Sequence, residues 1–394
     1  MKKYLYIILI TWMLLAMTIT QATTLKVATF NVSMEALNYI DHKRGVPLNV
    51  SSKTLSNALK SDHQQIKNIA EIIQINSPDI ILLNEFDNQD DNHQALKSFI
   101  KNYLNKSQNG QKAINFPYFY QGPVNTGVNS GLDINGDGEK GKLPDDGFGY
   151  GHFPGHFGMV LLSKYPIDFD NIRSFQYFKR HDMPNALMPM DPVTNEPWYS
   201  QEVWQALRLS SKSHWDVPVN VDGKTIHILA SHPTPPVFDG PEDRHGTRNH
   251  DEIRFWHDYI SPEKSSYIYD DKDRQGGLKN KESFVILGDL NATTVDGNAI
   301  KAGIASLLGS DKIQDANPQS QAGEKHSPDN VHGKHHTAFW RMRVDYVLPS
   351  VSGLTIKDSG VFWPLKTDDN YRLIKDRKAS SDHRLVWLKL TTKN

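Results

Sequence analysis

The chain has 394 residues, 38% of them hydrophobic and 23% charged, which excludes a peptide hormone and a disordered protein and allows one large layered domain or two smaller ones. It has no cysteine, which excludes disulfide scaffolds, thiolate metal sites, cysteine nucleophiles and lipoprotein anchors. The formal net charge of −1 gives no sign of the strongly basic surface that is typical of nucleic-acid binding.

The first 22 residues have the layout of a secretory signal peptide. Lys2 and Lys3 precede an apolar stretch from Tyr4 to Ile19, and a small residue, Ala22, follows it. Threonines dilute this stretch below the ~20 apolar residues that a spanning helix needs. We therefore expect cleavage after Ala22 and a periplasmic or secreted protein, with a retained membrane anchor as the alternative.

In chain order, residues 23–394 alternate short β-branched runs with amphipathic helices, which is typical of a layered sheet-and-helix fold. One helix is predicted from about His63 to Asn76 and another from about Asp251 to Ile260, where Asn249 is placed to cap the first turn and Glu252 follows three residues later, at the capping-box spacing. The predicted strands are Leu25–Val32, Ile80–Leu83, Met159–Leu162, Thr225–Ala230, Phe284–Leu287, Arg343–Leu348 and His383–Leu388.

Four long polar insertions interrupt this pattern. They lie at roughly 105–155, 170–205, 236–248 and 316–338, and they contain too few regularly spaced apolar residues for a second core. We therefore expect one domain, residues 23–394, with long loops that form a binding surface.

Carboxylates, amides and histidines follow several of the apolar strands. A single Asp or Glu in such a place is usually a turn or a helix cap, and a histidine is often structural. Their repetition at several strand ends instead favours one functional site. The residues concerned are Asn31, Glu85, His232, Asp289, Asn291, Asp382 and His383.

These elements resemble, in the same order, those of the metal-dependent endonuclease/exonuclease/phosphatase superfamily. The resemblance covers residues 29–383 and rests on the combination of motifs rather than on any single one. Its segments 211–216 and 232–236 look like those of a secreted bacterial branch. The resemblance implies a DNase-like α/β fold, a four-layered sandwich of two packed mixed sheets flanked by helices. The matching motifs are Thr29-Phe30-Asn31, Asn84-Glu85, Ser231-His232, Gly288-Asp289-Leu290-Asn291, Arg343-Val344-Asp345-Tyr346 and Ser381-Asp382-His383.

The resemblance also implies a metal site. Glu85, helped by Asn31, is similar to the family's metal ligands, and Asp382 matches a position that approaches the metal. Hard carboxylate and amide oxygens suit Mg²⁺ or Mn²⁺. Phosphate esters resist nucleophilic attack, and a bound divalent cation of this kind is expected to make the attack easier.

Catalytic roles follow from the same resemblance. Asp289 looks like the residue that orients or deprotonates the attacking water, and Asn291 like a donor to the phosphoryl oxygen. His383 resembles the imidazole that stabilises the charge developing on the phosphate, and Asp345 the carboxylate that fixes its orientation. His232 matches a second histidine that faces the phosphate.

Two basic residues, Arg244 and Arg248, lie in what the sequence suggests is a loop after the His232 segment. Guanidinium groups there would bind substrate charge, or they would simply pair with neighbouring acidic residues in a solvated loop. Lys212 and His214 are further candidates for the same role.

The segment 133–139 is a candidate calcium site. Asp133, Asn135 and Asp137 match the first half of an EF-hand loop, but the twelfth position holds Pro144 instead of glutamate. The alternative is a plain turn-rich loop without calcium.

We therefore expect an exported, divalent-metal-dependent hydrolase of phosphodiesters, acting as a monomer with no protein partner. Its substrate would be a nucleic acid, a phospholipid or a small phosphodiester. A sphingomyelin or phospholipid phosphodiesterase with exposed aromatic loops at Phe153, Trp198 and Tyr199 is the first alternative, and a phosphomonoesterase the second. A non-catalytic binding protein on the same fold is a third, which the intact set of site residues disfavours.

Overall fold

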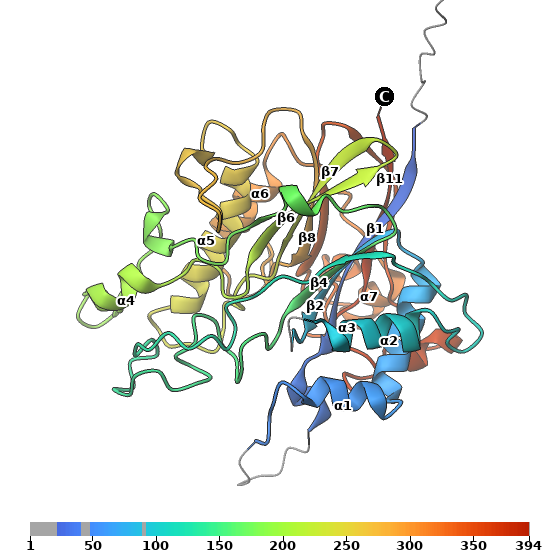
Figure 1. Ribbon diagram of the computed structural model, residues 1–394, viewed down its shortest axis with the longest axis horizontal. Coiled ribbons are helices and arrows are strands. Elements are labelled where there is room, and N and C mark those ends of the chain that lie inside the picture. The colour runs from blue at the N-terminus through green and yellow to red at the C-terminus, as the bar shows by residue number, and fades with distance from the viewer. Residues whose placement is uncertain (1–21, 41–47, 89–91, 394) are drawn as a thin grey trace, which may run out of the picture.

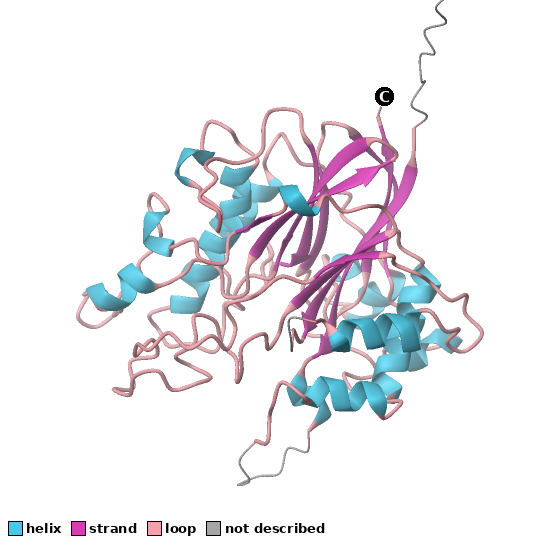
Figure 2. Cartoon of the chain, in the orientation of Figure 1, coloured by secondary structure: helices cyan, strands magenta, loops and turns pink. Residues whose placement is uncertain are grey.

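The computed structural model describes residues 22–40, 48–88 and 92–393, so the predicted signal peptide lies outside the described residues except for Ala22. This part of the chain forms two β-sheets that pack against each other, with helices on the outer side of each sheet (Figures 1 and 2). None of the described helices combines the length and the apolar composition that crossing a bilayer requires.

The first sheet has six strands in the order β10-β11-β1-β2-β4-β3. The parallel pair β1 and β2 lies at its centre, and antiparallel strands flank this pair on both sides. The strands are β1 (Thr24–Met34), β2 (Ile80–Phe86), β3 (Tyr118–Tyr120), β4 (Met159–Ser163), β10 (Leu354–Val361) and β11 (Val386–Thr392).

The second sheet has five strands in the order β5-β6-β7-β8-β9. It too contains one parallel pair, β7 and β8, between antiparallel neighbours. The strands are β5 (Arg173–Ser174), β6 (His214–Val221), β7 (Lys224–Ser231), β8 (Ser283–Asp289) and β9 (Asp345–Pro349).

The apolar residues of the second sheet alternate between two cores, as the two-residue period of a strand requires. In β8, Val285 and Leu287 contribute to the core shared with the first sheet, whereas Phe284 and Ile286 pack with α5 and α6. Helices α1, α2, α3 and α7 contribute apolar residues to the first core. The helices are α1 (Thr54–Lys60), α2 (Gln64–Asn76), α3 (Gln94–Phe99), α4 (Gln201–Ala206), α5 (Arg244–Tyr259), α6 (Lys301–Leu308) and α7 (Gln321–His326).

This arrangement confirms the predicted four-layered α/β sandwich. All seven predicted strands and both predicted helices are present, but some of their ends differ. Helix α5 begins at Arg244, not near Asp251, because the Asp243 side chain caps it by accepting a hydrogen bond from the Gly246 N–H at 3.1 Å. Strand β11 begins at Val386, not at His383, because the preceding segment pairs with the loop around Ala338 instead.

The two longest insertions also pack on each other. Ile134 from one and Tyr199, Val203 and Leu207 from the other or just beyond it form a small buried cluster. This cluster explains how loops with few apolar residues keep a defined position without a domain-sized core of their own.

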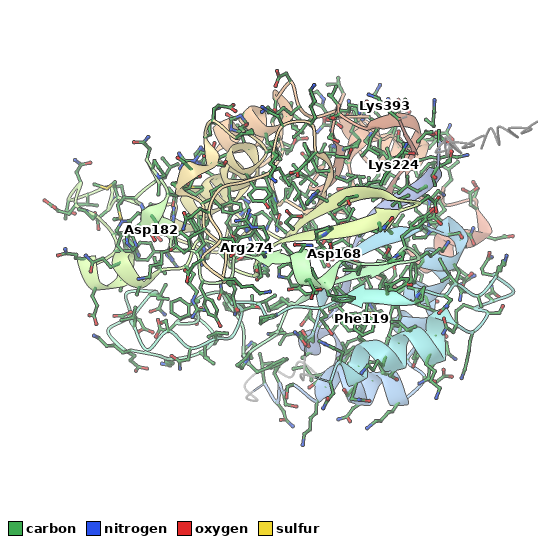
Figure 3. The ribbon with its side chains drawn as sticks, turned by 45° about the horizontal axis from the view of Figure 1, so that its top comes forward. Phe119, Asp168, Asp182, Lys224, Arg274 and Lys393 are labelled. Atoms are coloured by element: carbon green, nitrogen blue, oxygen red, sulfur yellow. The ribbon has the colours of Figure 1, made fainter. Side chains whose placement is uncertain are left out.

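The hairpin formed by β6 and β7 ends in an exposed turn close to the C-terminal end of the chain. Lys224 lies at this turn, and its Nζ donates to the carbonyl oxygen of Lys393 at 2.6 Å (Figure 3). The opposite ends of β6 and β7 lead into the region where the polar residues gather.

His227, Asp216 and Tyr259 form a charge network at the second sheet. His227 Nδ1 lies 2.7 Å from Asp216 Oδ1, and Tyr259 donates to the other oxygen of Asp216 at 2.6 Å. Burial works against a charged imidazole, but the carboxylate of Asp216 outweighs it and raises the pKa of His227 above its ordinary value. The stabilisation is therefore complete below the unfolded pKa of ~6.5 and is lost as the pH rises through the folded value.

We expect His227→Gln to lower the free energy of unfolding by about 1 to 2 kcal/mol near pH 5.5, and by less at alkaline pH. Urea unfolding of both proteins across this pH range measures the difference. A difference that stays constant with pH would show that His227 contributes no titrating charge.

Candidate active site

The polar residues gather where the strands of both sheets end. Parallel strands carry their C-terminal ends to the same edge of a sheet, so β1 and β2 bring Asn31 and Glu85 together, and β7 and β8 bring His232 and Asp289 together. Antiparallel β9 starts at this edge and places Asp345 opposite Asp289 in register. Because the two sheets face each other, these ends meet in one buried cluster.

Asp289 is the centre of the cluster. Its Oδ2 lies 3.2 Å from Asn31 Nδ2, 3.3 Å from His232 Nε2 and 3.6 Å from His383 Nε2. Burial would raise the pKa of Asp289, but the two histidines outweigh it and hold this pKa well below the ordinary value. Asp289 is therefore an ionised carboxylate at neutral pH, better suited to orient a water molecule by accepting its hydrogen bond than to take its proton.

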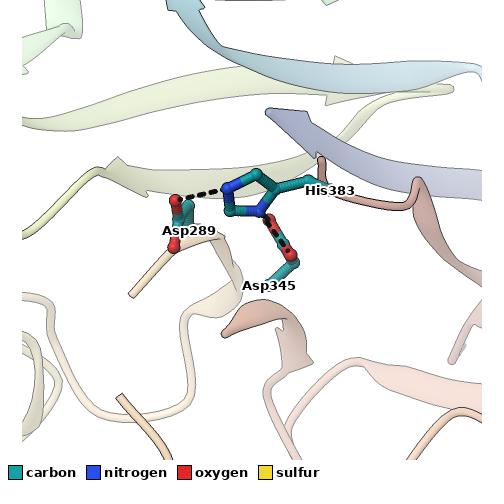
Figure 4. A group of neighbouring side chains, drawn as sticks. All are labelled: Asp289, Asp345 and His383. Atoms are coloured by element: carbon teal, nitrogen blue, oxygen red, sulfur yellow. Dashed lines mark hydrogen bonds and ion pairs between the residues drawn. The ribbon is translucent and has the colours of Figure 1, made fainter. Parts of the chain in front are cut away.

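His383 and Asp345 form a buried pair beside Asp289 (Figure 4). His383 Nδ1 lies 3.0 Å from Asp345 Oδ2, and the Thr337 hydroxyl accepts from the Asp345 N–H at 3.1 Å. Burial disfavours the imidazolium, but the carboxylates of Asp345 and Asp289 outweigh it and raise the pKa of His383 to about 10. Burial raises the pKa of Asp345 as well, against the attraction of His383. The pair places a fixed imidazolium at the site.

Glu85 lies at the end of β2 in a left-handed backbone conformation, with φ of 56°, which is rare for a residue with a side chain. Its carboxyl group hydrogen-bonds Asn31, and Asp382 lies close enough to interact with it electrostatically. Burial raises the pKa of Glu85 above its ordinary value. A partly exposed carboxylate beside an amide oxygen and a second carboxylate is a set of hard donors that fits a divalent cation such as Mg²⁺ or Mn²⁺.

A second set of possible ligand atoms exists among the described residues. Atoms of Asp289, Asp345 and His383 all lie within 4.8 Å of one another. The imidazole Nδ1 in this set already donates to Asp345, so Glu85, Asn31 and Asp382 are the better match for a metal.

His232 and Asn291 complete the cluster. Burial and the nearby Lys212 lower the pKa of His232, so a neutral imidazole is favoured, and its Nδ1 is buried without a hydrogen bond. Asn291 also has a left-handed backbone, with φ of 53°, and its Nδ2 donates to the Pro233 carbonyl at 3.1 Å. The structure therefore brings together all the residues that the sequence assigns to the metal and to catalysis.

Arg244 and Arg248 are not in a loop, as the sequence suggested, but in the first turns of α5, because the helix begins earlier than expected. Arg244 pairs with Glu242. Arg248 donates to the carbonyl oxygens of Leu209 at 2.9 Å and Phe148 at 2.6 Å. Both guanidinium groups thus have partners within the protein, and their role in binding substrate remains a prediction.

The candidate calcium residues lie apart from the cluster, in the long segment between β3 and β4. Asp133 accepts hydrogen bonds from the N–H groups of Gly136 and Gly138 at 2.7 and 2.9 Å, and Asn135 donates to Asp137 at 3.1 Å. The loop therefore has the turns that the plain structural alternative requires, and calcium binding remains a prediction.

The aromatic residues considered for a membrane-facing loop do not form an exposed patch. Phe153 and Tyr199 are buried, and Trp198 packs next to the small cluster that Tyr199 joins. A different aromatic residue, Trp340, is half-exposed beside the site, and its ring contacts the His383 ring edge-to-face at 4.7 Å.

Sequence reasoning did not assign a role to Asn84, which joins the two sheets. Its Oδ1 accepts from the Asp289 N–H at 3.3 Å and its Nδ2 donates to the Ser231 carbonyl at 3.5 Å. The only available signal was an amide that interrupts an apolar strand directly before Glu85. A polar side chain at a buried strand position indicates a contact with another buried polar group.

A model of the Endonuclease/Exonuclease/phosphatase family matches residues 28–383, a range that includes every residue of the cluster. The sequence has no match among the curated proteins. Similar solved structures include an endonuclease/exonuclease/phosphatase from Beutenbergia cavernae DSM 12333, with 17% identity, 94% of this chain and 72% of that chain covered, and a TM-score of 0.49.

Two further structures are similar at the level of the whole chain. The human Nocturnin catalytic domain with bound sulfate has 13% identity, 95% of this chain and 97% of that chain covered, and a TM-score of 0.48. A mutant beta toxin from Staphylococcus aureus with bound magnesium ions has 13% identity, 94% of this chain and 100% of that chain covered, and a TM-score of 0.42.

Proposed function

The chain belongs to the endonuclease/exonuclease/phosphatase family, and we propose that it is an exported, divalent-metal-dependent phosphoesterase that hydrolyses phosphodiester bonds by attack of water. The observation that carries this proposal is the buried convergence of Asp289, His383 and Asp345 next to Glu85 and Asn31. This set combines an acceptor that orients water, an imidazolium for phosphoryl charge and oxygen donors for a metal. The proposed hydrolysis uses all three functions.

The metal in this proposal is Mg²⁺ or Mn²⁺, held by Glu85 and Asn31 with Asp382 close by. When bound, such an ion supplies positive charge that reduces the repulsion between an anionic phosphate and its nucleophile. The raised pKa of Glu85 supports the proposal, since a positive charge nearby stabilises the ionised form of a desolvated carboxylate.

The side chains of the cluster have separate roles in the proposed reaction. The Asp289 carboxylate orients the attacking water, and its low pKa keeps it ionised throughout. The imidazolium of His383 donates from Nε2 toward the phosphoryl oxygens, and Asp345 fixes its orientation through Nδ1. His232 and the amide of Asn291 face the phosphate from the other side of Asp289.

We test the proposal with purified residues 23–394 and four substrates: bis-p-nitrophenyl phosphate, p-nitrophenyl phosphate, plasmid DNA and sphingomyelin, each with Mg²⁺, Mn²⁺, Ca²⁺ or EDTA. Turnover of at least one phosphodiester that needs Mg²⁺ or Mn²⁺ and stops in EDTA is expected. A preference for p-nitrophenyl phosphate or for sphingomyelin would favour the corresponding alternative. Turnover that persists in EDTA would contradict metal dependence.

Export and a monomeric state belong to the same proposal. Protein isolated from the periplasm or the medium is expected to begin at Thr23, which N-terminal sequencing detects. Recovery of the protein only from the cytoplasm with Met1 intact would contradict export.

A further inference from the structure

A pocket of about 250 Å³ lies between the segment that follows β8 and the segment that precedes β9. The proposed mechanism assigns no role to this pocket. One wall runs from Thr293 to Asp296, and another belongs to the end of the insertion at 316–338, which contributes three histidines. The carboxylate, imidazole and guanidinium groups of the lining belong to Asp296, Asp315, His332, His335, His336 and Arg343.

Some of these groups already have partners within the protein. Arg343 donates to both carboxylate oxygens of Asp315, at 2.8 and 2.6 Å. His335 Nδ1 lies 3.1 Å from two backbone carbonyl oxygens. The guanidinium is therefore neutralised, which makes the pocket a poor site for an anion. The remaining carboxylate and imidazole groups are those of Asp296, His332 and His336.

Two polar atoms at this pocket lack a hydrogen-bond partner. The His336 side chain is fully buried, and its Nε2 lies 3.4 Å from Asp296 Oδ2. The two groups are not oriented as a hydrogen bond requires, and neither atom has another hydrogen-bond partner among the described residues. Because buried polar atoms almost always have a partner, such a pair indicates a place for a water molecule or an ion.

The other atoms of these two side chains are held in place. His336 Nδ1 lies 3.0 Å from the hydroxyl of the buried Ser327, and Asp296 Oδ1 accepts from Asn330 Nδ2 at 3.0 Å. Burial lowers the pKa of His336 although Asp296 is close, which favours a neutral imidazole. With its proton on Nδ1, the ring directs the Nε2 lone pair toward the carboxylate. A metal-binding histidine is typically fixed in this way through its second nitrogen.

The separation of the two atoms fits two ligands of one zinc ion. Zn²⁺ binds imidazole nitrogen and carboxylate oxygen at ~2.0 to 2.2 Å in tetrahedral sites, so two such ligands lie about 3.3 Å apart. The 3.4 Å between His336 Nε2 and Asp296 Oδ2 agrees with this value.

His332 is the third candidate ligand. It lines the same pocket, is partly exposed, and lies close enough to His336 to interact with it electrostatically. In the part of the chain that the structure describes, only the active-site residues already place three ligand atoms within 4.8 Å of one another. Binding of a metal at the pocket therefore requires the His332 side chain to turn toward the pair.

We propose that Asp296, His332 and His336 bind Zn²⁺, with water as a fourth ligand, at a site separate from the proposed Mg²⁺ or Mn²⁺ site. Two imidazoles and one carboxylate suit Zn²⁺, whereas Mg²⁺ prefers oxygen ligands alone. The ion joins the segment after β8 to the segment that leads to Thr337, whose hydroxyl accepts from the Asp345 N–H. This inference does not depend on the proposed hydrolysis.

The test measures Zn²⁺ binding to purified residues 23–394 by calorimetry in excess Mg²⁺. Removal of a group that merely supports a metal-binding histidine costs about 10-fold to 100-fold in metal affinity. We expect a loss of this size for Ser327→Ala, and at least as large a loss for His336→Gln and Asp296→Asn. Asp296→Asn keeps the oxygen that Asn330 binds and removes only the charged ligand.

His257→Gln is the matched control for these variants. His257 also lies beside a carboxylate, with its Nδ1 3.2 Å from Asp258 Oδ1, but this pair is hydrogen-bonded and does not line the pocket. Its Zn²⁺ affinity should equal that of the wild type. Glu85→Gln should also keep this affinity, because Glu85 belongs to the other proposed metal site.

Melting temperatures give a second readout, since a ligand that binds the folded state stabilises it. Zn²⁺ is expected to raise the Tm of the wild type and of His257→Gln, but not that of Asp296→Asn. If the buried His336→Gln variant does not fold, Asp296→Asn decides, because its side chain is 22% exposed.

The remaining outcomes are equally decisive. Loss of Zn²⁺ binding in Asp296→Asn supports the site whether or not the wild type hydrolyses a substrate. Equal Zn²⁺ affinities of wild type and Asp296→Asn overturn the inference, as does a wild type that binds no Zn²⁺. Loss of binding in Glu85→Gln but not in Asp296→Asn would place the ion in the active site and would also overturn it.

Discussion

An Asp289→Asn variant is expected to lose about 10²-fold to 10⁴-fold in kcat toward whichever phosphodiester the wild type hydrolyses. Asn31 donates a hydrogen bond to Asp289 Oδ2, and the Nε2 atoms of His232 and His383 lie 3.3 and 3.6 Å from the same oxygen. An asparagine has the same shape, but its amide nitrogen cannot accept a hydrogen bond, and the carboxylate charge that supports the imidazolium disappears. The measurement is steady-state hydrolysis at saturating metal, with circular dichroism to check the fold.

Asp168→Asn is the matched control for this variant. Asp168 is exposed, lies outside the cluster and accepts a hydrogen bond from Asn171 at 2.7 Å (Figure 3). It should retain the activity of the wild type. If Asp289→Asn were as active as Asp168→Asn, the reaction would not use the cluster around Asp289.

The position of this cluster could be predicted from the sequence for a simple physical reason. Glu85 lies at the end of an apolar strand in the parallel pair β1 and β2, and Asp289 lies at the end of one in the parallel pair β7 and β8. Both residues therefore reach the same edge of the fold. Buried parallel strands have continuous apolar runs, and a polar residue at their end is therefore visible in the sequence. The pairing of the two sheets could not be derived in this way and came from the resemblance to a family.

Strand β6 was not predicted, because its sequence contains the residues that usually end a strand. Pro218 lies in its middle, and Asp216 interrupts the apolar alternation. The structure shows that Asp216 is balanced by His227 and Tyr259, two partners that are distant in sequence. A buried charge that is balanced by residues distant in the sequence cannot be recognised from the residues next to it.

The role of α5 was misread for a related reason. Asn249 and Glu252 have the spacing of a helix cap, and a local explanation was therefore sufficient for both. In the structure Asp243 caps the helix, and both residues instead form buried hydrogen bonds with the segment after His232. The spacing of Asn249 and Glu252 fits a helix cap, but this fit does not prevent the two residues from making long-range contacts instead. Such contacts are visible only in the folded structure.

The second large effect is expected at His383. Replacing it with alanine should lower kcat by about 10²-fold to 10³-fold, because the imidazolium is a fixed donor for the charge that develops on the phosphate. Asp345→Asn should cost less, since the imidazole remains but loses the carboxylate that orients Nδ1 at 3.0 Å. Steady-state kinetics of the two variants and of the double variant form a double-mutant cycle.

If Asp345 acts through His383, the double variant should be no slower than His383→Ala alone, because an absent imidazole cannot be misoriented. Asp345→Asn should also shift the alkaline limit of activity to lower pH. The carboxylates of Asp345 and Asp289 raise the pKa of His383 to about 10, so removing one of them lowers this pKa and the imidazolium is lost earlier as the pH rises. Additive losses in the cycle together with an unchanged pH profile would assign Asp345 a role of its own, independent of the imidazole.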